Sequence, residues 1–318
     1  MLRLIVVPLD GSSFGEQALP LAIRIAERQR AELELVHVFE TLPAYETQGA
    51  PPPDPALDVD LRKDRQSYLD GITDWLRRNT SAKVSARLLT GDDVAAMLSA
   101  YLNERHADLV TMATHGRGGL SRIWLGSVAN DLVRRADVPV LLIRPTESGS
   151  RDTPSVPFRL AVIPLDGSPA DDEAIDDAIA VAGDPGVELL LLHVVVPVVY
   201  LTDPPATALS IELEIESAMQ QYLEEVARRV RARGFPVNTR VLADASPAHA
   251  IVEVANERGA DLIAMETHAW RGVSRLLLGS VTDKVIRAAR VPVLVHRRRV
   301  EAEQAGTEAR GAGLHARR

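Results

Sequence analysis

The two halves of this chain carry the same motifs in the same order. Residues 4–12, LIVVPLDGS, match residues 160–168, LAVIPLDGS, and residues 112–128, MATHGRGGLSRIWLGSV, match residues 265–281, METHAWRGVSRLLLGSV. With an internal repeat on this scale, the second half must repeat whatever fold the first half adopts. In a chain of 318 residues the repeat predicts two domains in tandem.

Composition marks the segments that separate the expected domains and elements. Residues 146–157 are rich in Ser, Thr and Pro, as linkers are. After residue 297 the apolar periodicity ends, and we expect a disordered tail over residues 298–318. The proline-bearing stretches 41–60 and 197–209 are predicted to be long loops. The two domains are therefore expected over residues 1–145 and 158–297.

Each half alternates unbroken apolar runs, which are typical of buried parallel strands, with amphipathic segments of helical period. The strand-like runs begin near residues 4, 33, 84, 107 and 138, and again near residues 160, 189, 237, 260 and 291. Helices are expected over 16–27, 61–79, 94–105 and from 127, and over 171–182, 211–233, 248–258 and from 280. Strands alternating with helices predict a parallel sheet covered on both faces. The expected fold class is α/β, with two tandem doubly wound, Rossmann-like domains of five parallel strands each.

The connection from the fourth strand to the last helix is rich in glycine. In the first half, residues 116–119 (GRGG) follow the strand, and Gly126 and Ser127 precede the helix. Glycine lets backbone N–H groups approach an anion closely, and a helix N-terminus favours negative charge. The loop therefore predicts a phosphate ligand, with an ordinary flexible loop as the alternative. In a doubly wound sheet this loop and the turn at Asp10 lie on the edge where ligands bind.

Composition argues against several classes of function. A formal net charge of -8 is unfavourable for a nucleic-acid partner, which needs a basic face. The chain has no cysteine, which excludes disulfides, thiol catalysis and cysteine-type zinc sites. No apolar run approaches the ~18 residues of a membrane span, and the first run breaks at Pro8, too early for a signal peptide. We expect a cytoplasmic protein without a membrane or nucleic-acid partner.

Taken together, these motifs resemble the universal stress protein family, here as a tandem pair covering nearly the whole chain outside the linker and tail. The family's ATP-binding signature is Gly, two residues, Gly, nine residues, and then Gly followed by Ser or Thr. The first half departs from this signature only at Ala113, and Gly116, Gly126 and Ser127 match it. The match is specific because the acid after the first strand, the nine-residue spacing and the Gly-Ser pair occur together, twice.

The second half departs further from the signature. It keeps Gly279 and Ser280, but Glu266 and Ala269 replace the two early glycines. A Cβ is unfavourable where positive φ is needed, and a carboxylate near polyphosphate repels it unless a cation bridges the two. We therefore expect the second half to bind nucleotide more weakly than the first, or not at all.

The resemblance implies how ATP, with or without Mg²⁺, is held. In ATP-binding members the acid after strand one and main-chain groups of strand two hold the adenosine, and the glycine loop holds the phosphates. The implied residues of the first half are Pro8, Asp10 and Val38 for the nucleoside, and Ala113, Thr114, His115, Gly116, Gly126, Ser127 and Val128 for the phosphates. Their equivalents in the second half are Pro164, Asp166, Val194, Gly279, Ser280 and Val281. No catalytic residue and no metal ligand of the protein are implied.

Several of these side chains also have purely structural interpretations. Asp10 and Asp166 are common turn residues before glycine, so the residues alone leave a turn role and a ribose contact equally open. Ser127 and Ser280 suit helix N-caps, a role compatible with phosphate contact. Other polar candidates have a structural default: His115 and His268 as loop hydrogen-bonding residues, His37 and His193 as satisfied strand residues, Arg122 and Arg275 as solvated side chains.

These observations lead to an ATP-binding protein with a regulatory or stress-response role. The chain lacks the lysine of a Gly-Lys-Ser/Thr phosphate loop and a clear pair of metal carboxylates, so a dedicated ATPase or kinase is not indicated, although slow hydrolysis stays open. The alternative is an interaction scaffold of the same fold that binds no nucleotide. The resemblance also implies that the final strands, over 138–143 and 291–295, pair to form an internal pseudo-dimer. A homodimer and an unidentified protein partner are further expectations.

Overall fold

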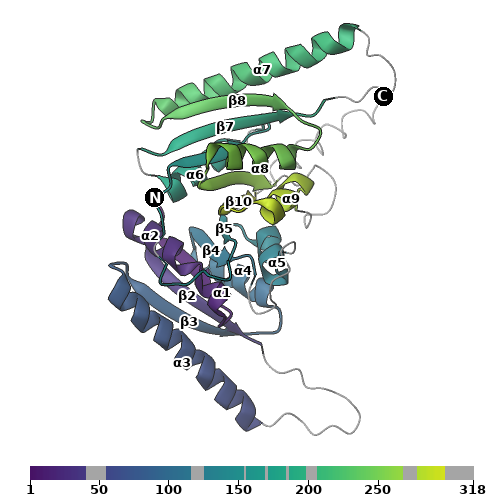
Figure 1. The fold of residues 1–318 in the computed structure, drawn as a ribbon. Coiled ribbons are helices and arrows are strands. Elements are labelled where there is room, and N and C mark those ends of the chain that lie inside the picture. Colours follow the sequence, from purple (N-terminus) through teal and green to yellow (C-terminus); the bar gives the residue numbers. More distant parts are fainter. Residues whose placement is uncertain are drawn as a thin grey trace, which may run out of the picture.

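The computed structural model describes residues 1–40, 55–115, 125–153, 155–168, 171–183, 186–197, 206–267 and 278–297. In this part of the chain ten strands form one continuous sheet, with helices on both of its faces (Figure 1). The first half of the chain supplies one end of the sheet and the second half supplies the other.

The helices and strands repeat in the two halves. The first half contributes β1 (Leu4–Pro8), α1 (Ser13–Glu16), α2 (Leu19–Gln29), β2 (Glu32–Phe39), α3 (Pro55–Asn79), β3 (Val84–Thr90), α4 (Val94–Arg105), β4 (Leu109–Ala113), α5 (Ser127–Arg135) and β5 (Val140–Ile143). The second half contributes β6 (Leu160–Pro164), α6 (Asp171–Ala182), β7 (Glu188–Val195), α7 (Ala206–Arg231), β8 (Val237–Ala243), α8 (Pro247–Arg258), β9 (Leu262–Thr267), α9 (Ser280–Ala288) and β10 (Val293–Arg297). Every strand-like run predicted from the sequence corresponds to a strand.

The strand order is β3-β2-β1-β4-β5-β10-β9-β6-β7-β8, and neighbouring strands within each half are parallel. In each half the order reverses beside the first strand, between β1 and β4 and between β6 and β9, which is the arrangement of a doubly wound sheet. The predicted fold class is therefore confirmed. The halves join where β5 pairs antiparallel with β10, with Leu294 opposite Leu141. This pairing of the final strands is the one that the family resemblance implies.

Buried apolar side chains lie on both faces of the sheet, which explains why the strand runs do not alternate with polar residues. In β1, Ile5 and Val7 belong to one core cluster, and Leu4 and Val6 belong to the other. Each cluster contains residues from both halves of the chain. The two domains therefore share their hydrophobic cores across the β5–β10 seam.

The helix predicted over residues 16–27 is wrong as a single helix, because the chain forms the separate helices α1 and α2 there. Pro20 lies in the first turn of α2 and has no N–H with which to continue a hydrogen-bonded helix from α1. Ser12 is the N-cap of α1, and its hydroxyl accepts a hydrogen bond from the N–H of Gly15.

The N-caps predicted at Ser127 and Ser280 are wrong by one residue. Gly126 and Gly279 occupy the N-cap positions of α5 and α9, so both serines lie in the first helical turn. The reason is visible at Gly126, where a Cβ would lie only 3.0 Å from the carbonyl oxygen of Thr114. The chain turns into the helix at a point that is too crowded for a side chain.

The two long helices begin earlier than predicted. α3 starts at Pro55 and α7 at Ala206, inside the stretches predicted to be loops. Proline is favoured at the start of a helix because the first N–H groups need no helical partner. The two helices lie at opposite ends of the molecule, beside the edge strands β3 and β8 (Figure 1). No helix in the described ranges is both long enough and apolar enough to cross a membrane.

The segment between the domains is bonded to the first domain over its described residues. The side chain of Gln17 donates to the carbonyl of Thr146 at 2.8 Å and accepts from its N–H at 2.9 Å. Arg151 pairs with Glu16 at 3.0 Å, and its guanidinium lies 5.3 Å from the ring centroid of Trp75. This linker is therefore docked on the first domain.

We predict that Leu141→Ala destabilises the chain, because Leu141 is fully buried beside the seam. Removing a buried leucine side chain costs about 2–5 kcal/mol in the free energy of unfolding. The control Val59→Ala, at a side chain that is 64% exposed, should change it by less than about 0.5 kcal/mol. Urea denaturation followed by circular dichroism measures both variants, and equal effects would contradict a shared core at the seam.

Candidate functional site

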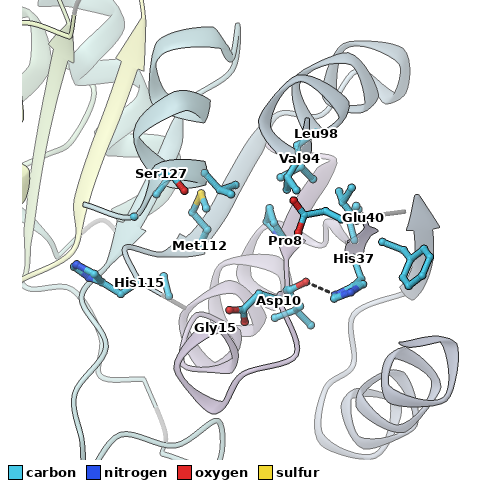
Figure 2. Close-up of a pocket in the computed structure, with 18 of the residues that line it drawn as sticks. Pro8, Asp10, Gly15, His37, Glu40, Val94, Leu98, Met112, His115 and Ser127 are labelled. Carbon is cyan, nitrogen blue, oxygen red and sulfur yellow. Dashed lines mark hydrogen bonds between the residues drawn. The ribbon is translucent and has the colours of Figure 1, made fainter. Parts of the chain in front are cut away.

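A cavity of about 580 Å³ opens at the carboxyl ends of β1, β2 and β4 in the first half (Figure 2). It lies where the strand order reverses between β1 and β4, the place where doubly wound sheets bind ligands. Nine residues predicted for the first-half site line it: Pro8, Asp10, Val38, Ala113, Thr114, His115, Gly126, Ser127 and Val128. The other predicted or weighed loop residues lie outside the described ranges: Gly116, Gly118, Gly119, Arg122, His268, Ala269 and Arg275.

The turn after β1 forms one end of the cavity. Oδ1 of Asp10 accepts hydrogen bonds from the N–H of Ser12 at 2.9 Å and from its hydroxyl at 2.6 Å. Gly11 has a φ of 84°, a conformation that favours glycine. A Cβ at Gly15 would lie 2.7 Å from Oδ1 of Asp10, so the carboxylate keeps its half-buried position because residue 15 has no side chain.

The start of α5 forms the other end. After β4 the chain returns at Gly126, whose N–H donates to the carbonyl of Thr114 at 2.8 Å. Ser127 and Val128 then begin the helix and line the cavity. The first N–H groups of a helix have no partner within it, and the helix dipole is positive there. This end of the cavity therefore suits an anion.

Apolar side chains form the walls between these two ends. Val36, Leu61, Val94, Leu98 and Met112 all line the cavity. Two charged side chains join the lining, Glu40 after β2 and Arg65 on α3. A cavity with apolar walls, a carboxylate at one end and helix N–H groups at the other can hold a ligand with a flat apolar part and an anionic part.

The strand histidines are satisfied, as predicted. Nδ1 of His37 lies 2.7 Å from the carbonyl oxygen of Leu9, and Nδ1 of His193 lies 2.8 Å from that of Leu165. Each bond ties the second strand of its half to the turn after the first strand. The role of these histidines is to fix the turn beside the site.

His115 has a different environment, at the end of the cavity formed by the start of α5. Its Nδ1 lies 3.0 Å from the hydroxyl of Thr114, and its Nε2 is buried without a hydrogen-bond partner among the described residues. Burial, followed by the positive charges of Arg144 and Arg287, lowers the pKa of the His115 imidazole. The ring is therefore held in its neutral form.

The second half repeats the framework of this site. Oδ1 of Asp166 accepts from the N–H of Ser168 at 3.0 Å, and Gly167 has a φ of 85°. The second-half residues predicted for the site stand at matching places: Pro164 at the end of β6, Val194 in β7, Asp166 in the turn, and Gly279, Ser280 and Val281 at the start of α9.

One substitution changes the turn of the second half. Asp171 stands five residues after Asp166, where the first half has Gly15 five residues after Asp10. Its side chain is almost fully buried at 5% exposure, and its carboxylate accepts from the N–H groups of Gly167 at 2.9 Å and Asp166 at 3.3 Å. Burial raises the pKa of this carboxyl. Asp166 is exposed, whereas Asp10 is half-buried, as expected if a side chain at this position displaces the turn carboxylate.

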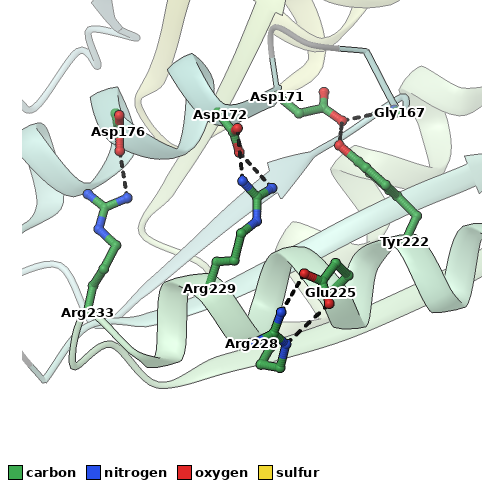
Figure 3. A network of polar contacts seen from close by, with 9 residues as sticks. All are labelled: Gly167, Asp171, Asp172, Asp176, Tyr222, Glu225, Arg228, Arg229 and Arg233. Atoms are coloured by element: carbon green, nitrogen blue, oxygen red, sulfur yellow. Dashed lines mark hydrogen bonds and ion pairs between the residues drawn. The ribbon is translucent and has the colours of Figure 1, made fainter.

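Contacts between α6 and α7 hold Asp171 in this place (Figure 3). The hydroxyl of Tyr222 donates to Asp171 at 2.7 Å. About two turns further along α7, Arg229 forms a two-pronged pair with Asp172 at 3.1 and 3.0 Å. Just after the end of α7, Arg233 pairs with Asp176 at 2.7 Å. The buried carboxylate is thus part of the packing between these helices.

Comparison with known proteins decides the family. The sequence model of the universal stress protein family matches residues 1–144 and, separately, residues 157–297. This chain belongs to the universal stress protein family. The resemblance predicted from the repeated motifs is confirmed, and the chain holds two such domains in tandem.

Similar universal stress proteins come from bacteria and archaea. The universal stress protein Rv2005c of Mycobacterium tuberculosis is 29% identical over 303 residues, spanning 92% of this chain and 96% of the relative. A universal stress protein of Methanocaldococcus jannaschii is 38% identical over 140 residues, spanning 43% of this chain and 81% of the relative. A crystal structure of a universal stress protein from Archaeoglobus fulgidus has a TM-score of 0.64 at 20% identity, covering 94% of this chain and 97% of that chain, which indicates the same fold.

Several residues that line the cavity were not predicted from the sequence. Val94 and Leu98 line the cavity from one face of α4, and their spacing of four gives a helical-face signal that could have placed them. Glu40 lies two residues after the predicted Val38, so strand alternation offered a signal there too. Arg65 gave no signal, because its position depends on how α3 packs.

We predict that His115 titrates below its ordinary pKa of 6.5 and is neutral at pH 7. Arg144→Gln should raise that pKa by removing one nearby positive charge, while Arg135→Gln, which removes a charge paired with Asp93, should not. Proton NMR of the 8 histidines, with His115→Gln for assignment, measures the titration.

The same shift fixes the sign of a stability effect. Because the folded-state pKa of His115 lies below the unfolded value, the unfolded chain takes up this proton first as the pH falls through about 6.5. The contribution of His115 to stability should therefore decrease from that pH down to the folded-state pKa. A His115 resonance that titrates above 6.5 would contradict the assigned environment.

Proposed function

We propose that this protein is an ATP-binding universal stress protein with a regulatory or stress-response role, and that the first-half cavity holds the nucleotide. One observation carries the proposal: nine residues implied by the family's nucleoside and phosphate contacts surround a single cavity of about 580 Å³. Their predicted grouping rested on a sequence motif, whereas the cavity is a property of the fold. The agreement of the two supports the proposal.

The residues present suit ATP in chemical terms. A volume of about 580 Å³ lies within the usual range for small-molecule sites. Val94, Leu98 and Met112 offer apolar surface to an adenine ring, and the carboxylate of Asp10 offers an acceptor for ribose hydroxyls. The N-terminus of α5 offers N–H donors to phosphates. Mg²⁺ that accompanies ATP would be held mainly by phosphate oxygens, as is usual for this ion.

The role we propose is binding without a dedicated catalytic apparatus. His115 lines the phosphate end of the cavity, and its hydrogen-bond partner among the described residues is the hydroxyl of Thr114. Neither side chain is paired with a carboxylate in the described residues, so an oriented general base is not assembled there. Bound nucleotide would act as a signal that changes how the protein meets its partners, within the cytoplasm.

A non-nucleotide role is favoured for the second half by Asp171. Its carboxylate occupies the turn that corresponds to the nucleoside end and accepts the N–H of Gly167 at 2.9 Å. We propose that the second domain binds ATP weakly or not at all and serves as an interaction or scaffold domain. This structural reason is independent of Glu266 and Ala269, the changes in the glycine loop.

We predict one tight ATP site per chain, dependent on Asp10. Asp10→Ala should weaken ATP binding about tenfold or more, because hydrogen bonds to a charged group contribute roughly 1.5–3 kcal/mol. The matched control Asp166→Ala, at the same place in the second half, should leave the ATP affinity of the first-half site unchanged. Isothermal titration calorimetry on the full chain measures both. Two sites of equal affinity would contradict the assignment to the first half.

A second binding test transfers the second-half residue into the first half. Gly15→Asp should reduce ATP affinity by at least about tenfold, because its Cβ would meet Oδ1 of Asp10 at 2.7 Å and a second carboxylate would enter the turn. Asp171 shows that the fold accommodates aspartate at the equivalent position, so circular dichroism should show a folded variant. Gly71→Ala is the control, because a Cβ at Gly71 has no atom within 4 Å. If Gly15→Asp bound ATP with the affinity of the parent, the turn after β1 could not be part of the ATP site.

A further inference from the structure

The antiparallel seam brings the end of a second-domain helix beside the strand ends that border the first domain's site. Because β5 and β10 run in opposite directions, the start of β10 lies beside the end of β5, with Val293 opposite Leu142. α9 ends at Ala288, only five residues before β10 begins at Val293. The end of β5 is also next to the end of β4, where Ala113 stands opposite Ile143 and begins the phosphate end of the cavity.

Hydrogen bonds connect these three chain ends. Arg144, the residue after β5, donates from Nη1 to the carbonyl of Ala289, the C-cap of α9, at 3.0 Å. One residue earlier, the carbonyl of Ile143 accepts the N–H of Thr114 at 2.8 Å. The last turn of α9 is therefore linked through Arg144 to the residues that line the anionic end of the first cavity.

Arg287 lies in that last turn of α9, two residues before Ala289. Its guanidinium is held by Asp283, with Nε at 2.8 Å and Nη2 at 2.9 Å from the two carboxylate oxygens. The side chain is 28% exposed, so it is positioned but not sealed from a ligand. Its positive charge also reaches His115, where it contributes to lowering the pKa of the imidazole, after burial and Arg144.

We propose that Arg287, carried by the second domain, completes the phosphate end of the first domain's site and contacts the outer phosphates of the bound nucleotide. This inference rests on the proposed function. A guanidinium is always charged and offers a planar fork of N–H donors that matches phosphate oxygens. His115, held neutral, supplies no positive charge at this end, so the arginines of the seam supply it.

The equivalent residue of the first half provides the comparison. Arg134 occupies the same helical position on α5 as Arg287 does on α9, and Asn130 stands in the place of Asp283. The carbonyl of Arg134 accepts a hydrogen bond from Arg297, the counterpart of Arg144. Pseudo-symmetry thus directs Arg134 toward the second domain, where Asp171 has altered the turn.

The experiment is a calorimetric titration of the full chain with ATP and, separately, with AMP. Arg287→Ala should weaken ATP binding about tenfold or more and change AMP binding by less than about twofold, because AMP has no outer phosphates. Arg134→Ala, the matched control, should leave both affinities at the parent value. Arg287→Ala should also raise the pKa of His115 in the NMR titration, which checks that the guanidinium lies where we place it.

The outcomes separate this inference from the proposed function. If the parent binds neither nucleotide, the proposed function is overturned together with the inference. If the parent binds ATP and Arg287→Ala binds it equally well, or loses ATP and AMP to the same extent, the inference alone is overturned. If Arg287→Ala does not fold by circular dichroism, Arg287→Gln, which keeps most of the side-chain length, is held to the same criteria.

Discussion

The antiparallel pairing of β5 with β10 is the interaction on which the rest of the structure depends. Each half alone would end in an apolar edge strand with unpaired N–H and carbonyl groups. Such an edge is prone to aggregation because another chain can pair with it. Pairing the two edges satisfies these groups and lets both hydrophobic cores continue from one half to the other. It also sets the relative direction of the domains, and that direction brings the end of α9 beside Arg144, next to the strand ends that border the first cavity.

The difference between the two sites begins with a single atom. Gly15 and Asp171 stand at the same place in the repeat, and one carries a Cβ where the other has none. Without the Cβ, the carboxylate of Asp10 lies half-buried against the cavity. With it, a buried carboxylate bonds the turn itself, and Tyr222 and the α6–α7 ion pairs hold it there. The position of the Asp171 carboxylate is thus held by contacts with α7, a helix far away in the sequence.

The parts of this structure that were predictable from sequence are those set by local pattern. Apolar runs located every strand, and segments of helical period located the helices between them. The alternation of strands and helices then indicated the sheet edge at which the cavity opens. Main-chain positions such as Pro8 and Gly126 were predictable because the motif reports backbone geometry. Asp171 was not, because an acid in the first turn of a helix usually faces solvent, and its partner Tyr222 is 51 residues away. The environment of Arg287 could not be predicted either, because it depends on how two domains meet.

The covalent linkage of the two domains has a consequence for what each copy can become. In a dimer of identical subunits, every substitution appears on both sides of the two-fold axis, so both sites must change together. Here the linker, docked through Gln17 and Arg151, puts both copies in one chain, and each position can diverge alone. Gly15 can remain beside Asp10 in the first half while Asp171 bonds the corresponding turn of the second, and Asp283 can hold Arg287 on α9 where α5 has Asn130.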